Sequence, residues 1–134
     1  TQSMVIGGAS DLTFTGALNL GTTTRTLTVT NTGLTTFSGV ASGTAGLAKA
    51  GAGQLALSGL NTFTGPVAVQ AGVLSVNSLA NLSAASALGA PTTAAGGTIA
   101  LGSAASSATL RYTGAGHSTN RVLNLAGTTG VATL

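Results

Sequence analysis

Pairs of apolar residues separated by one small or polar residue recur along the chain, and this pattern constrains the fold more than any other feature. In such a triplet the two apolar side chains share one face of an extended strand, as in a strand with one buried side. Gly, Asn and Ser separate the triplets, as expected of turns. Successive triplets start 7 to 13 residues apart through much of the chain. Examples are Leu12-Thr-Phe14, Leu18-Asn-Leu20, Leu27-Thr-Val29, Leu55-Ala-Leu57, Val67-Ala-Val69 and Leu74-Ser-Val76.

Many short strands at this spacing are typical of a sandwich, a barrel or a solenoid. The solenoid is favoured because the strands are very short, the inward residues are small aliphatics that can stack, and the sequence repeats itself. Aromatic residues make up only 3% of the chain, which argues for a thin aliphatic core. The sequence therefore predicts an all-β fold, a parallel β-helix with coils of roughly 20 residues and little or no helix.

A long internal repeat supports this prediction. Residues 12–17 match residues 110–115 at an offset of 98, and residues 25–29 match residues 121–125 at an offset of 96. Such a period corresponds to several coils of a solenoid rather than to one. We expect a unit of roughly 97 residues, at about 12–109, and a second copy that starts near residue 110.

The whole chain, residues 1–134, is expected to form a single solenoid segment, interrupted at one place. Residues 78–89 lack the triplet pattern and are followed by Pro91. Ser78 is suited to the start of a helix and Gly89 to its end. The segment 78–89 is therefore expected to be a short helix or a loop insertion.

The composition excludes most chemistry. Charged residues make up 4% of the chain, with one Asp, one His and no Cys. These residues cannot supply a carboxylate pair, a multi-ligand metal site or a thiol, so we expect no enzyme, cofactor or metal. A hydrolase triad of Asp11, His117 and a Ser is disfavoured because no nucleophile motif surrounds any Ser. Four dispersed cations form no nucleic-acid patch, and no apolar run is long enough to insert in a membrane.

Residues 47–76 contain one dense motif of glycines, leucines and valines at alternating positions. It resembles the autotransporter passenger-associated repeat, whose pattern runs L-x-K-x-G-x-G-x-L-x-L-S-G-x-N-x-[YF]-x-G and continues to G-x-L-x-V. Pro66 departs from that pattern and bears only on the local turn. The matching positions are Leu47, Lys49, Gly51, Gly53, Leu55, Leu57, Ser58, Gly59, Asn61, Phe63, Gly65, Val67, Val69, Gly72, Leu74 and Val76.

The resemblance implies a right-handed parallel β-helix, exported by a type V route and displayed or released outside a Gram-negative cell. It implies that the motif glycines lie at bends. It also implies that six motif residues point inward: Leu55, Leu57, Val67, Val69, Leu74 and Val76. Asn61 is expected to adopt left-handed backbone geometry or to bond a turn backbone, and Lys49 is expected to lie on the outside.

The expected function is structural: a stalk or surface-fibre segment whose partners are further coils of the same or identical chains, stacked end to end. Neither end carries a cluster of Lys, Glu or Pro, so the solenoid is expected to continue past both. One alternative is an adhesin that contacts a glycan or host surface. A minor alternative is an ice-binding solenoid, suggested by alternating threonines such as Thr26, Thr28 and Thr30.

Overall fold

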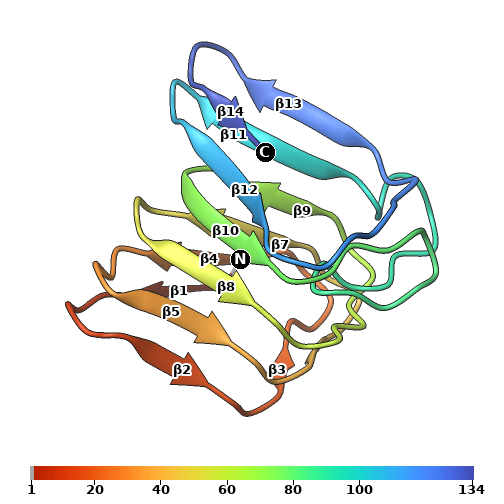
Figure 1. Cartoon of the computed structure of the whole chain (residues 1–134), viewed down its shortest axis with the longest axis horizontal. Helices are drawn as coiled ribbons and strands as arrows, with labels where there is room; N and C mark the ends of the chain where they lie inside the picture. Colours follow the sequence, from red (N-terminus) through yellow and green to blue (C-terminus); the bar gives the residue numbers. More distant parts are fainter. Residues whose placement is uncertain (1) are drawn as a thin grey trace.

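Short extended segments that alternate apolar and small residues pair side by side in this chain, and each corner between them is turned by glycine or a polar residue. The computed structural model describes residues 2–134 as a β-solenoid of about six turns without helix (Figure 1). All pairing between its strands is parallel. The predicted all-β parallel solenoid is confirmed.

Two six-stranded sheets form the long faces, and a two-stranded sheet begins a third face. The first sheet contains β1 (Ser3–Ile6), β4 (Arg25–Val29), β7 (Leu47–Ala50), β9 (Val67–Val69), β11 (Ile99–Ala104) and β13 (Leu123–Gly127). The second contains β2 (Leu12–Phe14), β5 (Leu34–Phe37), β8 (Gln54–Leu57), β10 (Gly72–Val76), β12 (Ala108–Tyr112) and β14 (Ala132–Thr133). The third pairs β3 (Leu18–Asn19) with β6 (Ala41–Ser42).

The ladder register gives the length of each coil. On the first sheet Ser3 pairs with Thr26, and the same row continues through residues 48, 68, 100 and 124. Successive coils therefore advance by 23, 22, 20, 32 and 24 residues. Most coils are close to the expected length, and the one long coil contains residues 77–98.

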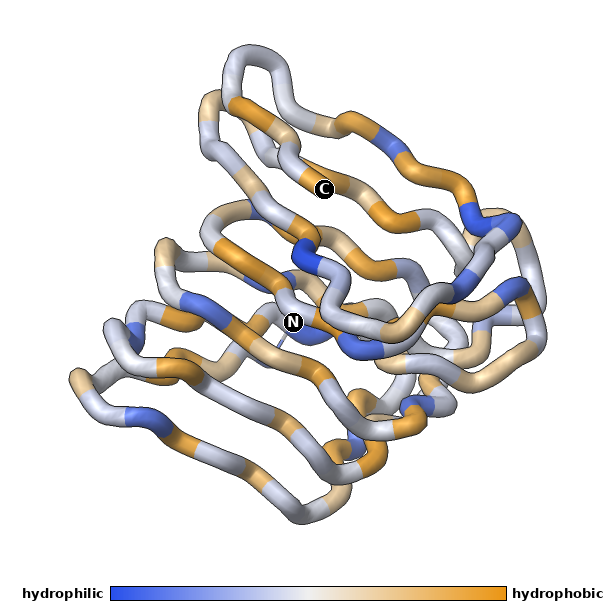
Figure 2. Tube along the Cα trace, in the orientation of Figure 1, coloured by the Kyte–Doolittle hydropathy of each residue, from blue (hydrophilic) through white to orange (hydrophobic). Residues whose placement is uncertain are grey.

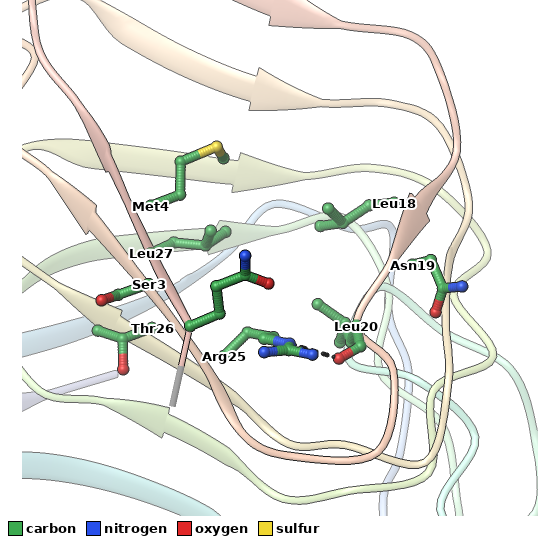
Figure 3. A pocket seen from close by; sticks show the side chains of 9 residues that line it. Ser3, Met4, Leu18, Asn19, Leu20, Arg25, Thr26 and Leu27 are labelled. Atoms are coloured by element: carbon green, nitrogen blue, oxygen red, sulfur yellow. Dashed lines mark hydrogen bonds between the residues drawn. The ribbon is translucent and has the colours of Figure 1, made fainter.

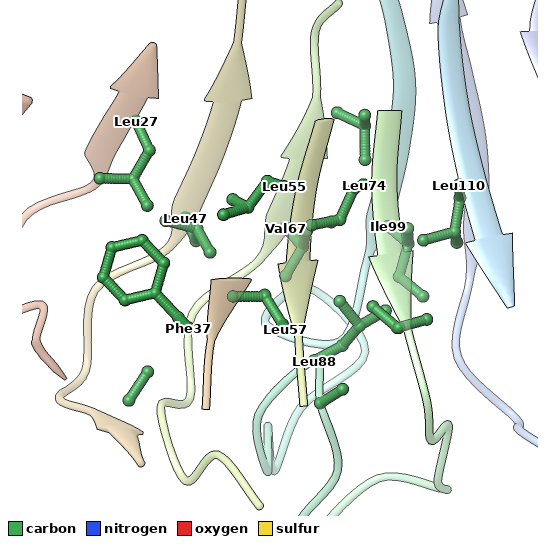
Figure 4. Packing of buried hydrophobic residues seen from close by; sticks show 14 of the residues in the cluster. Leu27, Phe37, Leu47, Leu55, Leu57, Val67, Leu74, Leu88, Ile99 and Leu110 are labelled. Carbon is green, nitrogen blue, oxygen red and sulfur yellow. The ribbon is translucent and has the colours of Figure 1, made fainter. Parts of the chain in front are cut away.

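Apolar side chains stack in columns between the two large sheets (Figure 4). One column on the second sheet runs from Phe14 through Phe37, Leu57 and Val76 to Tyr112. Its two phenylalanine rings stack at 4.5 Å with a 13° tilt. The six motif residues predicted to point inward are all buried, and none is more than 2% exposed: Leu55, Leu57, Val67, Val69, Leu74 and Val76.

The segment 78–89 is a loop with turns, part of the excursion 77–98 between β10 and β11. The hydroxyl of Ser78 accepts a hydrogen bond from the amide of Ala87 at 2.9 Å, which closes a loop instead of capping a first helical turn. Leu88 from this loop is fully buried in the core (Figure 4).

The two copies of the internal repeat fall on the same two sheets. Leu12 and Leu110 share one row of the second sheet, and Arg25 shares a row of the first sheet with Leu123. In both rows the two residues lie 98 positions apart, so the offset of 96 expected for residues 25–29 is not that of the ladder. Leu123, and not Arg121, occupies the position equivalent to Arg25. Within the described residues no helix is suited to crossing a bilayer.

We predict that Leu57→Asp prevents folding, because a carboxylate would lie at a position only 2% exposed. The buried cations Lys49 and Arg121 give their hydrogen bonds to backbone carbonyls and are not free to pair with it. The expected loss is more than ~4 kcal/mol, measured by urea unfolding followed by circular dichroism. Leu60→Asp, at a position 65% exposed, is the control and should unfold like the parent. A cooperative melt of Leu57→Asp near the parent's temperature would contradict the inward assignment.

Candidate functional site

The motif lysine lies inside the solenoid, so the expectation that Lys49 is on the outside is wrong. Its side chain is 0% exposed. Lys49 is two residues after the inward-facing Leu47, and the period of two in a strand puts both on the same face. In the ladder Lys49 lies between Leu27 of the preceding coil and Val69 of the next. The triplet pattern thus contained the correct placement, and the usual exposure of lysine obscured it.

The Lys49 ammonium group replaces water with three backbone carbonyl oxygens. Nζ donates to the carbonyl oxygens of Ala50 at 3.1 Å and Gly51 at 2.8 Å, at the corner of its own coil. It also donates to the carbonyl oxygen of Ala71 at 3.0 Å, at the same corner of the next coil. Burial lowers the pKa of Lys49 to about 8. One side chain therefore joins the corners of two successive coils.

Two glycines make this corner possible. Gly51 has a φ of +79°, and a Cβ there would lie 2.4 Å from the Val29 carbonyl oxygen. Gly72, one coil later, has a φ of +69°, and a Cβ there would lie 2.5 Å from the Gly51 carbonyl oxygen. Side chains at these positions would push the coils apart. A side chain at residue 72 would also displace the Gly51 carbonyl group that Lys49 binds.

Asn61 makes a second connection between coils at another corner. Its Oδ1 accepts a hydrogen bond from the amide of Ala41 at 2.7 Å, and its Nδ2 donates to the carbonyl oxygen of Ala87 at 2.7 Å. The side chain is only 1% exposed. Of the two expectations for Asn61, left-handed geometry is not found, and the bond to a turn backbone is found at Ala87. The other bond goes to strand β6, so the side chain reaches both neighbouring coils.

Arg121 is a buried cation that sequence reasoning missed. Its Nε donates to the carbonyl oxygen of Gly97 at 2.8 Å, and its Nη1 donates to that of Leu88 at 2.7 Å. Burial lowers the pKa of Arg121 to about 10. Its Nη2 has no hydrogen-bond partner among residues 2–134. Arg121 thus fastens the excursion 77–98 to the coil that follows it, and its available sequence signal was its rarity in a nearly uncharged chain.

The structure keeps the two residues of the disfavoured triad apart. Asp11 precedes β2 in the first coil, and its carboxylate accepts a hydrogen bond from the amide of Leu34 at 2.8 Å. His117 follows β12, four strands along the second sheet, where its Nδ1 is hydrogen-bonded to the Tyr112 hydroxyl. In the part of the chain that the structure describes, no three His, Asp, Glu or Cys residues gather to hold a metal.

The two end coils expose apolar side chains. At the first coil a groove of about 310 Å³ lies between β1, β3 and β4, and its lining includes Met4, Leu18 and Leu27 (Figure 3). Arg25 flanks it and donates from Nε to the Leu20 carbonyl oxygen at 2.7 Å. At the last coil the exposed apolar residues are Leu123, Leu125, Val131 and Leu134. Figure 2 shows hydrophobic residues along both outer coils.

The threonines do not form a ladder from coil to coil. Thr26 pairs with Ser3 and Ala48, and Thr28 pairs with Val5 and Ala50. On the second sheet Thr13 pairs with Thr36, and the row continues as alanine and serine. The regular hydroxyl array that the ice-binding alternative requires is therefore lacking on the described strands.

Comparison with known proteins places the motif in a family. Residues 47–76 match the family model described as "Passenger-associated-transport-repeat", so the predicted resemblance is confirmed. A stretch of 68 residues is 56% identical to part of "Adhesin BmaC autotransporter" from Brucella suis biovar 1 (strain 1330). That stretch is 51% of this chain and 2% of the relative, so the chain spans only a small part of that protein's length. No solved structure matches the chain.

We predict that Lys49→Met lowers the free energy of unfolding by about 1–3 kcal/mol, because methionine leaves three carbonyl oxygens without a donor. Arg111→Met is the matched control, since Arg111 is exposed on β12 and its loss should change stability by less than about 0.5 kcal/mol. Urea unfolding at pH 7 measures both. Equal stabilities of Lys49→Met and the parent would show that the three bonds contribute nothing.

We also predict that the stability difference between the parent and Lys49→Met grows with pH. Between the folded pKa of about 8 and the ordinary lysine pKa of 10.5, the folded lysine has lost its proton and the unfolded lysine has kept it. Stability rises with pH wherever the unfolded state binds more protons, here by up to ~3 kcal/mol across that window. Urea unfolding at intervals from pH 7 to 11 measures the difference, and a flat or falling difference would contradict the burial of the ammonium group.

Proposed function

We propose that this chain, which carries a passenger-associated-transport-repeat, is a rigid, non-catalytic scaffold segment of an autotransporter-type surface protein. The observation that carries the proposal is a parallel ladder that runs through about six coils, with polar side chains joining successive coils at their corners. The buried side chains of Lys49 and Asn61 donate to backbone carbonyls of their own or of neighbouring coils, and such contacts stabilise a shape.

We also propose an extracellular location on a Gram-negative cell, which suits the same role. The passenger repeat and the Brucella relative both belong to autotransporters, which are displayed at the cell surface. A tightly paired ladder with few extended loops offers little unfolded backbone to proteases, which suits a protein exposed outside the cell.

We propose further solenoid coils as partners of both end faces. Among the strands of residues 2–134, β1 and β2 pair on one edge only at the first coil, and β13 and β14 do so at the last. Leu125, on β13, is 72% exposed although its row-mates Leu101 and Val69 are buried. Another coil, covalently continuous or from an identical chain, would cover such residues as each internal coil covers its neighbour.

Contact with a host surface is the second candidate function. It is favoured by the name of the Brucella relative, which describes that protein as an adhesin. In this chain an adhesive role requires exposed groups that can bind a ligand. The excursion 77–98, which lies beside the third face, contains such exposed polar residues. The two functions are compatible, because a scaffold can display a binding loop.

We predict that the chain self-associates at high concentration through its end coils, measured by sedimentation equilibrium from micromolar to near-millimolar protein. Leu125→Asp should abolish the association, because it places a charge on the last exposed row. Leu60→Asp, which changes a similarly exposed leucine away from the ends, should leave it intact. A parent that stays monomeric throughout, or equal association by Leu125→Asp, would count against coil-binding ends.

A further inference from the structure

The excursion 77–98 is joined to the coil before it and to the coil after it by different kinds of bond. Its bonds to the preceding coil include backbone bonds. The amide of Asn61 donates to the carbonyl oxygen of Ser86 at 3.0 Å, and the amide of Ala90 donates to that of Phe63 at 2.9 Å. Backbone bonds also join the earlier coils on the third face. On this side the excursion is therefore held to the ladder.

The loop after β12 closes over the other side of the excursion, and the two lie together at the right of Figure 1. Backbone bonds fix the two ends of this loop. The Thr113 amide donates to the Val76 carbonyl oxygen at 2.9 Å, and the Val122 carbonyl oxygen accepts from the Ile99 amide at 2.8 Å. Within the described residues, no backbone bond joins residues 114–121 to the excursion. We call this segment, residues 114–121, the strap.

The hydrogen bonds from the strap to the excursion, in the part of the chain that the structure describes, all involve side chains. The Oδ1 of Asn81 accepts from the amide of Asn120 at 2.9 Å, and the Oδ1 of Asn120 accepts from the amide of Leu82 at 2.9 Å. The Thr119 hydroxyl donates to the carbonyl oxygen of Ala80 at 2.8 Å. Both asparagines are exposed, so water can replace their bonds at little net cost.

Hydrophobic burial contributes little to closure of the strap. Its sequence is Gly-Ala-Gly-His-Ser-Thr-Asn-Arg, so alanine is its largest aliphatic side chain, and Ala115 is exposed. Gly116 has a φ of +120°, and a Cβ there would meet nothing within 4 Å. The bonds of the Tyr112 hydroxyl to Gly116 and His117 lie within one coil and do not reach the excursion. A segment with few buried apolar contacts and exposed hydrogen bonds opens at a lower free energy than the paired strands around it.

Closure of the strap buries a charge. The Arg121 side chain is 7% exposed, and its Nε and Nη1 donate to carbonyl oxygens of Gly97 and Leu88 in the excursion. Its Nη2 is also buried and has no hydrogen-bond partner among residues 2–134. The guanidinium group thus loses its hydration and gains partners for only two of its three nitrogens, so its desolvation opposes closure. The same desolvation lowers the pKa of Arg121 to about 10.

We propose that the strap opens and closes over the excursion while the ladder stays paired, and that closure masks the charge of Arg121. The chain has only four cationic side chains and one side-chain carboxylate, so each opening changes the charge that this side of the solenoid presents to solvent. The movement is confined to residues 114–121 because the ends of the loop are bonded to the ladder. This inference does not depend on coil stacking or on contact with a host surface.

Chemical labelling of the parent protein tests this, because three side chains report on three parts of the molecule. Arg111 is exposed on β12, Arg121 lies behind the strap, and Lys49 is 0% exposed inside the ladder. Phenylglyoxal modifies arginine, and an acetylating reagent modifies lysine. Mass spectrometry gives each initial rate, which is divided by the rate of the same residue in the urea-unfolded chain. We expect Arg111 to react at close to its unfolded rate, Arg121 more slowly, and Lys49 about tenfold or more below Arg121.

A double variant shows whether the strap controls access to Arg121. Asn81→Ala combined with Asn120→Ala removes two of the bonds that close the strap and changes no buried side chain. It should raise the normalised rate of Arg121 by about tenfold or more, as expected for two lost hydrogen bonds, and leave that of Lys49 unchanged. Asn19→Ala is the matched control, because Asn19 is also exposed and its Oδ1 accepts a backbone amide of its own turn at 2.9 Å.

The proposal is overturned if Arg121 of the parent reacts no faster than Lys49, because the strap would then open only when the ladder unfolds. It is also overturned if Arg121 reacts as fast as Arg111, because the strap would then not be closed. A double variant that leaves the Arg121 rate unchanged, or that raises the rates of Arg121 and Lys49 alike, overturns it as well. Thr119→Val removes one hydroxyl from the strap and keeps the shape of the side chain, so it repeats the test if the double variant does not fold.

Discussion

The parallel pairing of each coil with the next is the constraint on which the rest of the structure depends. A strand of two to six residues cannot hold its conformation alone, but in the two six-stranded sheets every internal strand is paired on both edges. The strict register then stacks like side chains on like, as in the column from Phe14 to Tyr112. Because the core is only one coil wide, small aliphatic residues fill it, and the low aromatic content follows from that geometry.

The corners pose the harder physical problem, because the backbone there turns away from the ladder and leaves carbonyl and amide groups buried. The passenger repeat addresses it with side chains that bind two coils at once. Lys49 supplies three donors to carbonyl oxygens on successive coils, and Asn61 supplies one donor and one acceptor in opposite directions. Glycine at positions 51 and 72 provides the space for these contacts. Polar motif residues thus act as connections inside the solenoid and not as an outer face.

Much of this fold could be predicted from the sequence, because its dominant signal is local. The alternation in Leu55-Ala-Leu57 and Val67-Ala-Val69 specified strand and inward face together, and both were correct. Lys49 was misplaced because the usual cost of burying a charge was given more weight than its position in the alternation. The bonds of Arg121 to Leu88 and Gly97 could not be predicted, since they depend on how an irregular excursion folds back on the solenoid. The pairing of Asn81 with Asn120 joins residues 39 apart in the sequence and carries no local signal.

The central structural claim is that carbonyl groups of two coils hold a lysine inside the solenoid. Lys49 is the only lysine in the sequence, so its side-chain resonances can be assigned without ambiguity. A pH titration of its ¹³Cε and ¹⁵Nζ signals by NMR measures its protonation directly. If Lys49 is buried in this way, the midpoint of its titration lies near pH 8 and its ammonium protons exchange slowly with water at neutral pH. A midpoint near the ordinary lysine pKa of 10.5 with fast proton exchange would place the lysine in solvent and contradict the proposed connection between coils.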